Sequence, residues 1–215
     1  MNRQTLLAGG RRWSRPLTLA LAVTLGAGTL AGCAPLLIGG AMIGGTMMVI
    51  DRRTSGAQVE DQAIELKSAS RVRELALPGN VNVTSYNRMV LLTGEVTREA
   101  DKAAVEQAVS RVDAVRSVVN DLAVMEPSTI GSRTNDGVLS GKVKASFIDA
   151  KDVQAQAAKV VTERGIVYLM GRVTEREANR YAEVARTVPG VQKVVRVFEI
   201  ITEAELAQIQ PAPKN

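Results

Sequence analysis

The sequence predicts an α+β fold built from two tandem αββαβ modules, each a small three-stranded mixed sheet with helices packed on it. The main observation is an internal repeat. MVLLTGEV at residues 89–96 corresponds to IVYLMGRV at residues 166–173, so that Gly94 aligns with Gly171. In each copy, segments of strand character alternate with segments of helical character, and a polar stretch separates the copies. Two modules that small are expected to pack on each other.

The first module is expected at residues 57–126, and its elements follow in order. QVEDQAIELKSASRVREL predicts a helix, and NVNVTSY predicts a strand because its apolar residues alternate with polar ones. A turn around Asn87-Arg88 leads into a second strand, MVLLTGEV. READKAAVEQAVSRV then predicts a second helix and AVRSVVNDLAV a closing strand.

The second module, expected at residues 138–203, repeats this order. NDGVLSGKVKASFIDA predicts its first helix, and Glu163-Arg164-Gly165 predicts the turn between its first two strands. Thr174 is a good N-cap for the next helix, which Pro189-Gly190 should end.

The remaining segments are predicted from their composition. The polar stretch at residues 127–137 predicts a linker, and residues 204–215 predict a frayed helical turn that runs into a disordered tail. Gly94 and Gly171 are interpreted as structural, because a glycine within a strand often marks a bulge or the close approach of another chain segment.

The N-terminus predicts an export signal followed by an apolar tether. Residues 1–32 carry four arginines, no acid and a long apolar run, and cleavage is expected just before Cys33. As the only cysteine, Cys33 cannot form an internal disulfide, and the chain contains no histidine that could complete a metal site. Residues 33–56 predict a flexible Gly-rich tether, with a short membrane-embedded or self-associating helix as the alternative.

Composition argues against several classes of function. Removing residues 1–32 leaves a net charge of +1, so nucleic acid is not an expected partner. The absence of histidine removes imidazole general-base catalysis, and Glu175 and Glu177 fit the acidic first turn of a helix better than an acid/base pair. We therefore expect no catalytic residues, no metal, no cofactor and a binding function.

Charge separates the two copies, since residues 57–126 have a net charge of −3 and residues 127–202 have +4. In the first helix of the second copy, Leu139, Val143 and Phe147 form one stripe, as expected for burial against the sheet. Nearly opposite lie Val138, Ala145 and Ile148, flanked by Lys142 and Lys144. Two explanations of this second stripe are open: packing on the other module, or shallow insertion between lipid headgroups.

Two motifs carry a family resemblance. Leu30-Ala31-Gly32-Cys33 resembles the lipobox of bacterial lipoproteins, in which the cysteine is acylated. VLLTGEVT and VYLMGRVTEREA resemble the BON domain, the bacterial OsmY and nodulation module. With two copies and a lipobox, residues 30–203 are similar to the dual-BON outer-membrane lipoprotein family of the DolP or YraP type.

The resemblance implies a function and a location. Cys33 would carry acyl chains and, with Ala34 after it, hold the protein at the outer membrane facing the periplasm. The second module would bind an anionic phospholipid such as phosphatidylglycerol, supporting envelope integrity and function at division sites. The lipid-facing set carried over by position is Val138, Lys142, Val143, Lys144 and Ile148. The alternative is a periplasmic adaptor whose paired modules dock an envelope protein.

Overall fold

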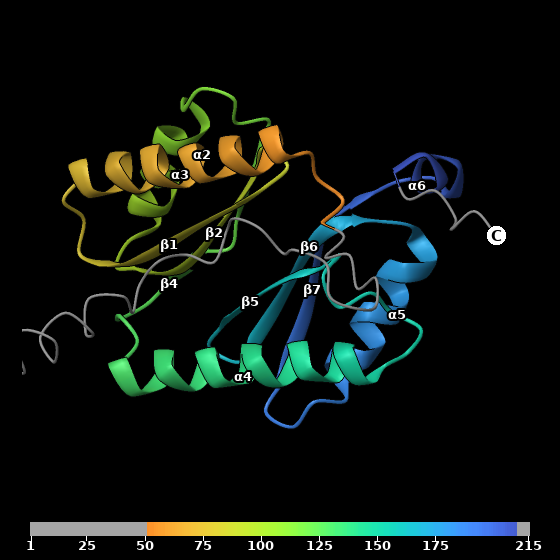
Figure 1. Ribbon diagram of the computed structural model, residues 1–215. Helices are drawn as coiled ribbons and strands as arrows, with labels where there is room; N and C mark the ends of the chain where they lie inside the picture. Colours follow the sequence, from red (N-terminus) through yellow and green to blue (C-terminus); the bar gives the residue numbers. More distant parts are fainter. Residues whose placement is uncertain (1–50, 210–215) are drawn as a thin grey trace, which may run out of the picture. The chain divides into compact units, whose positions relative to one another are not determined.

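The computed structural model describes residues 51–209, which contain both predicted modules (Figure 1). The first module comprises α2 (Ser55–Glu74), β1 (Gly79–Tyr86), β2 (Met89–Val96), α3 (Glu99–Ser110), β3 (Ser117–Asn120) and the short β4 (Ala123–Val124). The second comprises α4 (Ile130–Asp149), β5 (Lys159–Glu163), β6 (Ile166–Val173), α5 (Glu175–Arg186) and β7 (Lys193–Ile200), followed by α6 (Glu203–Ile209). The αββαβ order predicted for each copy is confirmed.

Both sheets have the same mixed topology. β1 pairs antiparallel with β2, and β2 pairs parallel with β3 and with β4. In the second module β5 pairs antiparallel with β6, and β6 pairs parallel with β7. Each antiparallel hairpin closes through two residues of positive φ, which are Asn87 and Arg88 in one and Arg164 and Gly165 in the other. Such turns match the natural twist of a hairpin, so the predicted turn positions are confirmed.

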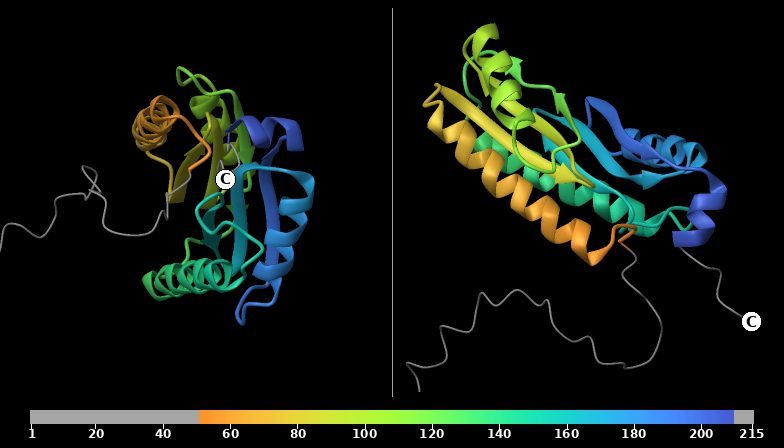
Figure 2. Two further views of the ribbon diagram at one scale, coloured as in Figure 1. Left: turned by 45° about the vertical axis from the view of Figure 1, so that its right-hand side comes forward. Right: turned by 90° about the horizontal axis from the view of Figure 1, so that it is seen from above.

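Each module buries one face of its sheet under its own two helices, α2 with α3 and α4 with α5 (Figure 2). Alternate side chains of β2, Val90, Leu92 and Val96, point into the first core. Val167, Leu169 and Val173 of β6 do the same in the second. The period of two along each central strand therefore divides it into a helix-facing side and a second side.

The second sides of the two sheets meet each other. Tyr86 and Leu91 of the first module form one buried cluster with Tyr168, Met170 and Val197 of the second. The expectation that the modules pack on each other is thus confirmed, and the contact joins sheet to sheet. It also explains why β2 and β6 are buried at most positions rather than at every second one.

Polar side chains cross the same boundary. Asn82 donates to Glu163 over 2.8 Å between Nδ2 and Oε2, and Arg164 donates to Glu95 over 3.0 Å between Nη1 and Oε1. Glu95 and Glu163 are both buried. Burial, opposed by the hydrogen bond from Asn82 and reinforced by the charge of Glu95, raises the pKa of Glu163.

Gly94 and Gly171 are places where two strands come too close for a side chain. A Cβ atom at Gly94 would lie 1.9 Å from the carbonyl oxygen of Asn80, and one at Gly171 would lie 2.4 Å from that of Ala157. Both carbonyls belong to the neighbouring chain segment in the same module. Close approach of another chain segment therefore accounts for a glycine at each position, which is what their interpretation as structural residues expects.

Three predicted boundaries differ from the structure. Most of the predicted linker forms the first two turns of α4, because Thr129 caps the helix by accepting from the N–H of Ser132. Part of the predicted tail forms α6, because Thr202 and Glu205 cap each other's backbone N–H groups. The predicted tether ends early, since α2 begins at Ser55. Residues 1–50, including Cys33 and the signal peptide, and residues 210–215 lie outside the described part. Within residues 51–209, no helix has the length and apolar character needed to cross a membrane.

Candidate functional site

A buried carboxylate fixes the rotation of α4 about its axis. Asp136 accepts hydrogen bonds from the backbone N–H groups of Arg164 and Gly165, each at 2.8 Å, and so ties the helix to the β5–β6 turn. One turn later, the hydroxyl of Ser140 donates to that of Thr162 in β5 at 2.8 Å. These contacts decide which side chains of α4 face the sheet and which face away.

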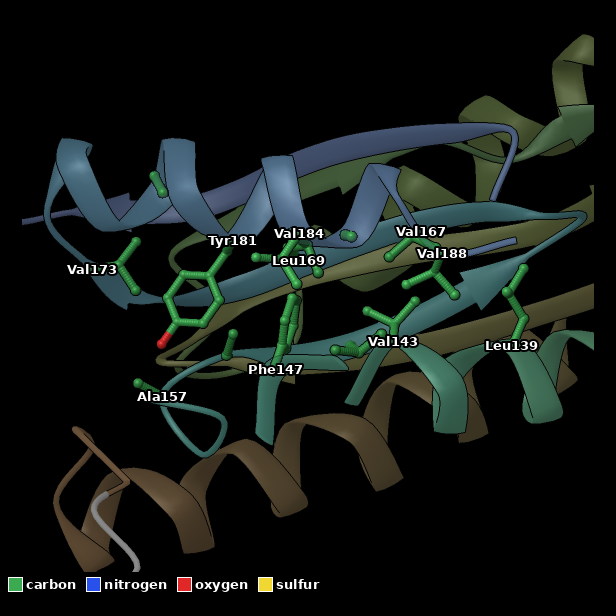
Figure 3. Close-up of a cluster of buried hydrophobic side chains, with 14 residues drawn as sticks. Leu139, Val143, Phe147, Ala157, Val167, Leu169, Val173, Tyr181, Val184 and Val188 are labelled. Carbon is green, nitrogen blue, oxygen red and sulfur yellow. The ribbon is translucent and has the colours of Figure 1, made fainter. Parts of the chain in front are cut away.

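The inner face of α4 is part of the core of the second module (Figure 3). Leu139, Val143 and Phe147 point toward the sheet, as the helical spacing predicts, and the ring of Phe147 meets that of Tyr181 edge-on with 5.1 Å between centroids. Val143 is fully buried. Its place in the lipid-facing set is therefore wrong: a side chain at that position of the helix fills the core and has no access to a ligand.

The outer face of α4 is apolar and uncovered. Val138 is 53% exposed and Ile148 is 69% exposed, while Gly141 and Ala145 between them are also exposed. Ile130, in the first turn, is 76% exposed. An exposed apolar stripe on a helix whose other side is already buried is the pattern of a surface that meets a second apolar partner.

The two lysines of the predicted set border this stripe. Lys142 and Lys144 are exposed, and neither has an ion-pair or hydrogen-bond partner among the described residues. Asp149, next to Ile148, is the exposed acid of α4, because Asp136 is buried in its contact with the hairpin turn. The centre of the outer face is therefore positively charged, and its charges are free to meet an anionic group.

The alternative in which the stripe packs on the first module is wrong. Val138 and Ile148 are exposed, and the apolar contact between the modules is the cluster of Tyr86, Leu91, Tyr168, Met170 and Val197, none of which belongs to α4. Helix α4 does reach the first module through Arg133, whose Nη1 donates to Oδ1 of Asn80 at 3.2 Å, but Arg133 is not part of the stripe. Of the five residues in the predicted lipid-facing set, the structure brings four together on one open face: Val138, Lys142, Lys144 and Ile148.

A pocket beside this face was missed by the sequence analysis. It has a volume of about 330 Å³ and opens between the first half of α4, the β5–β6 turn and the loop before β7. Its wall includes Val138 of the stripe and the bordering Lys142, together with the polar side chains of Ser132, Asn135 and Gln192. Three segments far apart in the sequence form it, so no local pattern could have indicated it.

The two acids at the start of α5 are both engaged in ion pairs. Glu177 is held in a capping box with Thr174 and accepts from Arg52, while Glu175 pairs with Arg196 at 3.2 Å. Although burial opposes it, the hydrogen bond from Arg52 contributes to a pKa of Glu177 below its usual range. Within residues 51–209, no cluster of histidine, cysteine or acidic side chains could hold a metal ion.

The two sheets, each with its own pair of helices, define a duplicated α+β module with an open helix face on the second copy. The model of the BON domain matches residues 60–126 and 135–202, and the chain belongs to the BON domain family, with two copies. It is 35% identical over 186 residues to the outer membrane lipoprotein DolP of Haemophilus influenzae, covering 84% of this chain and 95% of that protein. It is 30% identical to the 21 kDa hemolysin of Actinobacillus pleuropneumoniae, covering 71% of this chain and 80% of that protein.

A solved structure is also similar in part. It is the C-terminal domain of CdsD, a structural protein of the type III secretion system of Chlamydia trachomatis, with 11% identity, a TM-score of 0.27 and coverage of 64% of this chain and 96% of that chain.

The resemblance to the dual-BON lipoproteins is confirmed by these matches. The protein is a lipid-anchored BON lipoprotein of the outer membrane with a function in the cell envelope. BON-domain lipoproteins are a family not known as enzymes.

Proposed function

We propose that the outer face of α4 binds anionic phospholipid of the phosphatidylglycerol type, while acyl chains on Cys33 keep the protein at the membrane. The observation that carries the proposal is the uncovered apolar stripe of Val138, Ala145 and Ile148 beside two lysines that have no partner within residues 51–209. In this arrangement the apolar side chains enter the headgroup region and the lysines meet phosphate. The protein thereby supports envelope integrity and acts at division sites.

The free energies expected from the lysines and the apolar side chains add up to a modest interaction. Each lysine near an anionic leaflet contributes on the order of 1 kcal/mol. Full burial of a valine or isoleucine side chain contributes roughly 1.5–3 kcal/mol, and somewhat less here, because Val138 and Ile148 are already partly covered. The anchor at Cys33 raises the effective concentration of α4 at the membrane, so this weak binding suffices to read lipid composition.

The pocket next to the stripe supports a headgroup that carries hydroxyl groups. Ser132, Asn135 and Gln192 offer hydroxyl and amide groups that both donate and accept hydrogen bonds, and Lys142 lies at the same wall. A glycerol headgroup has the matching donors and acceptors, and its phosphate provides the negative charge for Lys142.

The proposal is tested by sedimentation of a non-lipidated fragment, residues 51–215, with vesicles of phosphatidylglycerol or of phosphatidylcholine. We expect binding to the anionic vesicles alone, and at least a tenfold loss of affinity in Val138→Glu. Leu66→Glu is the matched control, because Leu66 is 74% exposed on α2 of the first module and receives the same charge change. Binding that is equal for both lipids, or equally weakened by both substitutions, contradicts the proposal.

A second candidate is a periplasmic adaptor that docks an envelope protein. It is favoured by a further group of exposed apolar side chains near the connection between the modules: Val124, Met125 and Ile130. Photo-crosslinkers at Ile130 and at Ile148 distinguish the two functions. A defined protein adduct at these positions, in a protein that fails to sediment with vesicles, favours the adaptor.

A further inference from the structure

Two arginines near the start of the described chain, Arg52 and Arg53, reach into different modules. Arg52 belongs by sequence to the approach to the first module, yet its guanidinium lies against the second. Nη1 donates to the carbonyl oxygen of Arg172 at 2.9 Å and to Oε2 of Glu177 at 2.8 Å, and Nη2 donates to Oε1 of Glu177 at 2.7 Å. The side chain of Arg52 has no exposed surface.

Arg53 is directed to the first module. Its Nη1 donates to Oδ2 of Asp61 at 2.7 Å, and its guanidinium carbon lies 4.3 Å from the centre of the Tyr86 ring. Asp51 completes the arrangement by accepting from Nη2 of Arg53 at 2.7 Å. Two consecutive residues thus make charged contacts with α2 in one module and with α5 in the other.

The contact of Arg52 is of the strong kind. Two parallel hydrogen bonds between a guanidinium and a carboxylate combine charge with fixed geometry. Removing one partner of a buried ion pair leaves the other charge without compensation, so the pair resists opening. The chain is therefore held at Arg52 more firmly than a surface loop would be.

The position of these arginines in the sequence relates their contacts to Cys33. The seventeen residues at 34–50 contain no charged side chain and separate Cys33 from Asp51. Among the described residues, Arg52 and Arg53 are the first to contact the two modules. Without Arg52, the first of these contacts would be with the first module.

We propose that Arg52 and Arg53 form a clamp that fastens the chain arriving from Cys33 to both modules at once, and so presents α4 to the leaflet that holds the anchor. Arg52 is a positioning residue in this arrangement: it touches no lipid, but it transfers the restraint of the anchor to the module that carries α4. The presentation of α4 to the leaflet rests on the proposed function, whereas the clamp itself does not.

The clamp is tested in the full-length lipidated protein, reconstituted into vesicles of phosphatidylethanolamine with or without phosphatidylglycerol. The variant is Glu177→Gln, which removes the charge facing Arg52 and leaves an acceptor for the N–H of Thr174, so that α5 keeps its cap. Arg176→Gln is the matched control, because Arg176 is the exposed neighbour of Glu177 on the same helix.

The first readout is limited trypsin cleavage after Arg52 and Arg53, followed by mass spectrometry. We expect cleavage at least tenfold faster in Glu177→Gln than in the unmodified protein, and no change in Arg176→Gln. Circular dichroism confirms that each variant is folded. Equal cleavage rates in all three proteins overturn the clamp.

The second readout reports the position of α4. An environment-sensitive nitrobenzoxadiazole label on Ala145→Cys should show phosphatidylglycerol-dependent emission that falls by at least threefold in Glu177→Gln. Faster cleavage with unchanged emission overturns the positioning role. If the emission of the labelled protein with Glu177 intact does not depend on phosphatidylglycerol, the proposed lipid binding is contradicted. The cleavage rates still decide the clamp.

Discussion

Tyr168 of β6 donates a hydrogen bond to Asp121 across the boundary between the modules, with 2.7 Å between Oη and Oδ2. Tyr168 is fully buried, and burial together with Asp121 raises the pKa of its phenol above the ordinary range. We expect Tyr168→Phe to cost about 1 kcal/mol, because the cavity stays filled and one hydrogen bond is lost. Urea unfolding measures this, and the two modules should unfold less cooperatively.

The control for that prediction is Tyr181→Phe. Tyr181 donates to the carbonyl oxygen of Gln154 at 2.6 Å within the second module, so its loss costs a similar free energy without separating the modules. If both variants unfold with the same cooperativity, the hydrogen bond of Tyr168 does not couple the modules.

Two glycines of the second module should respond oppositely to alanine. Gly171→Ala places a methyl group 2.4 Å from a carbonyl oxygen and should lower the free energy of unfolding by about 3 kcal/mol or more. Gly141→Ala adds a methyl group in open space on α4 and should raise it by about 0.5–1 kcal/mol. Thermal unfolding of both variants measures the difference, and a stabilised Gly171→Ala protein would refute the close-approach explanation.

Asp61 should make the first module sensitive to acid. It accepts from the backbone N–H groups of Asn87 and Arg88, from Ser85 and from Arg53. Burial opposes ionisation, but these donors together lower the pKa of Asp61. A folded-state pKa below the unfolded value of about 3.9 gives stability that is present above that pH and is lost as the pH falls through the folded value.

Asp61→Asn should therefore lower the free energy of unfolding by about 2–3 kcal/mol at pH 7, with a smaller loss near pH 2. Asp113→Asn provides the control, because Asp113 is 90% exposed and only 3.4 Å from Lys67 in a surface pair. Chemical denaturation at a series of pH values measures both. A loss that is independent of pH would show that the charge of Asp61 is not responsible.

Glu163 should behave in the opposite direction. Around it lie Asn82, which donates to it, the acids Glu95 and Asp136, and the cation of Arg164. Because its folded-state pKa is raised, the stability it contributes is fully present below the unfolded pKa and is lost as the pH rises through the folded value. Glu163→Gln should therefore raise the Tm near neutral pH by a few degrees, about 1 kcal/mol corresponding to roughly 2–4 °C at this size.

Glu95→Gln is the informative comparison for Glu163→Gln. Glu95 is equally buried but is paired with Arg164, so its neutralisation should cost on the order of 2–3 kcal/mol. Scanning calorimetry at pH 5 and pH 7.5 measures both variants. Destabilisation of similar size in the two would contradict the raised pKa of Glu163.

Much of the fold could be predicted because its signals are local. The repeat, the period of two in the strands and the turn residues at Asn87-Arg88 and Arg164-Gly165 each depend on neighbours in the sequence. The packing of the modules on each other is expected from their small size, and the structure agrees, since nearly every residue of MVLLTGEV is buried, as in a strand covered on both sides.

The features that the sequence does not predict depend on contacts between distant segments. Asp136 looked like a linker residue because its partners, the N–H groups of the β5–β6 turn, lie some 28 positions away. For Val143, helical periodicity predicts a side chain buried against the sheet, whereas the resemblance implies a side chain that faces lipid. The structure agrees with the periodicity. Periodicity reports which side of a helix meets the core, whereas a positional correspondence can shift by one residue and move a side chain to the other face.

The contact of sheet with sheet has a consequence for how such a protein can change over time. Although Glu65 of α2 pairs with Lys159 and Arg133 of α4 donates to Asn80, the modules adhere mainly through their strands. Exposed positions such as Leu66 on α2 and Val138 and Ile148 on α4 take no part in holding them together. Substitutions there are released from the constraint that duplicated domains usually impose on each other. One copy can therefore gain cations and apolar side chains on its helix, and the other can become acidic, without weakening the contact between them. The two copies can in this way present different surfaces on the same fold.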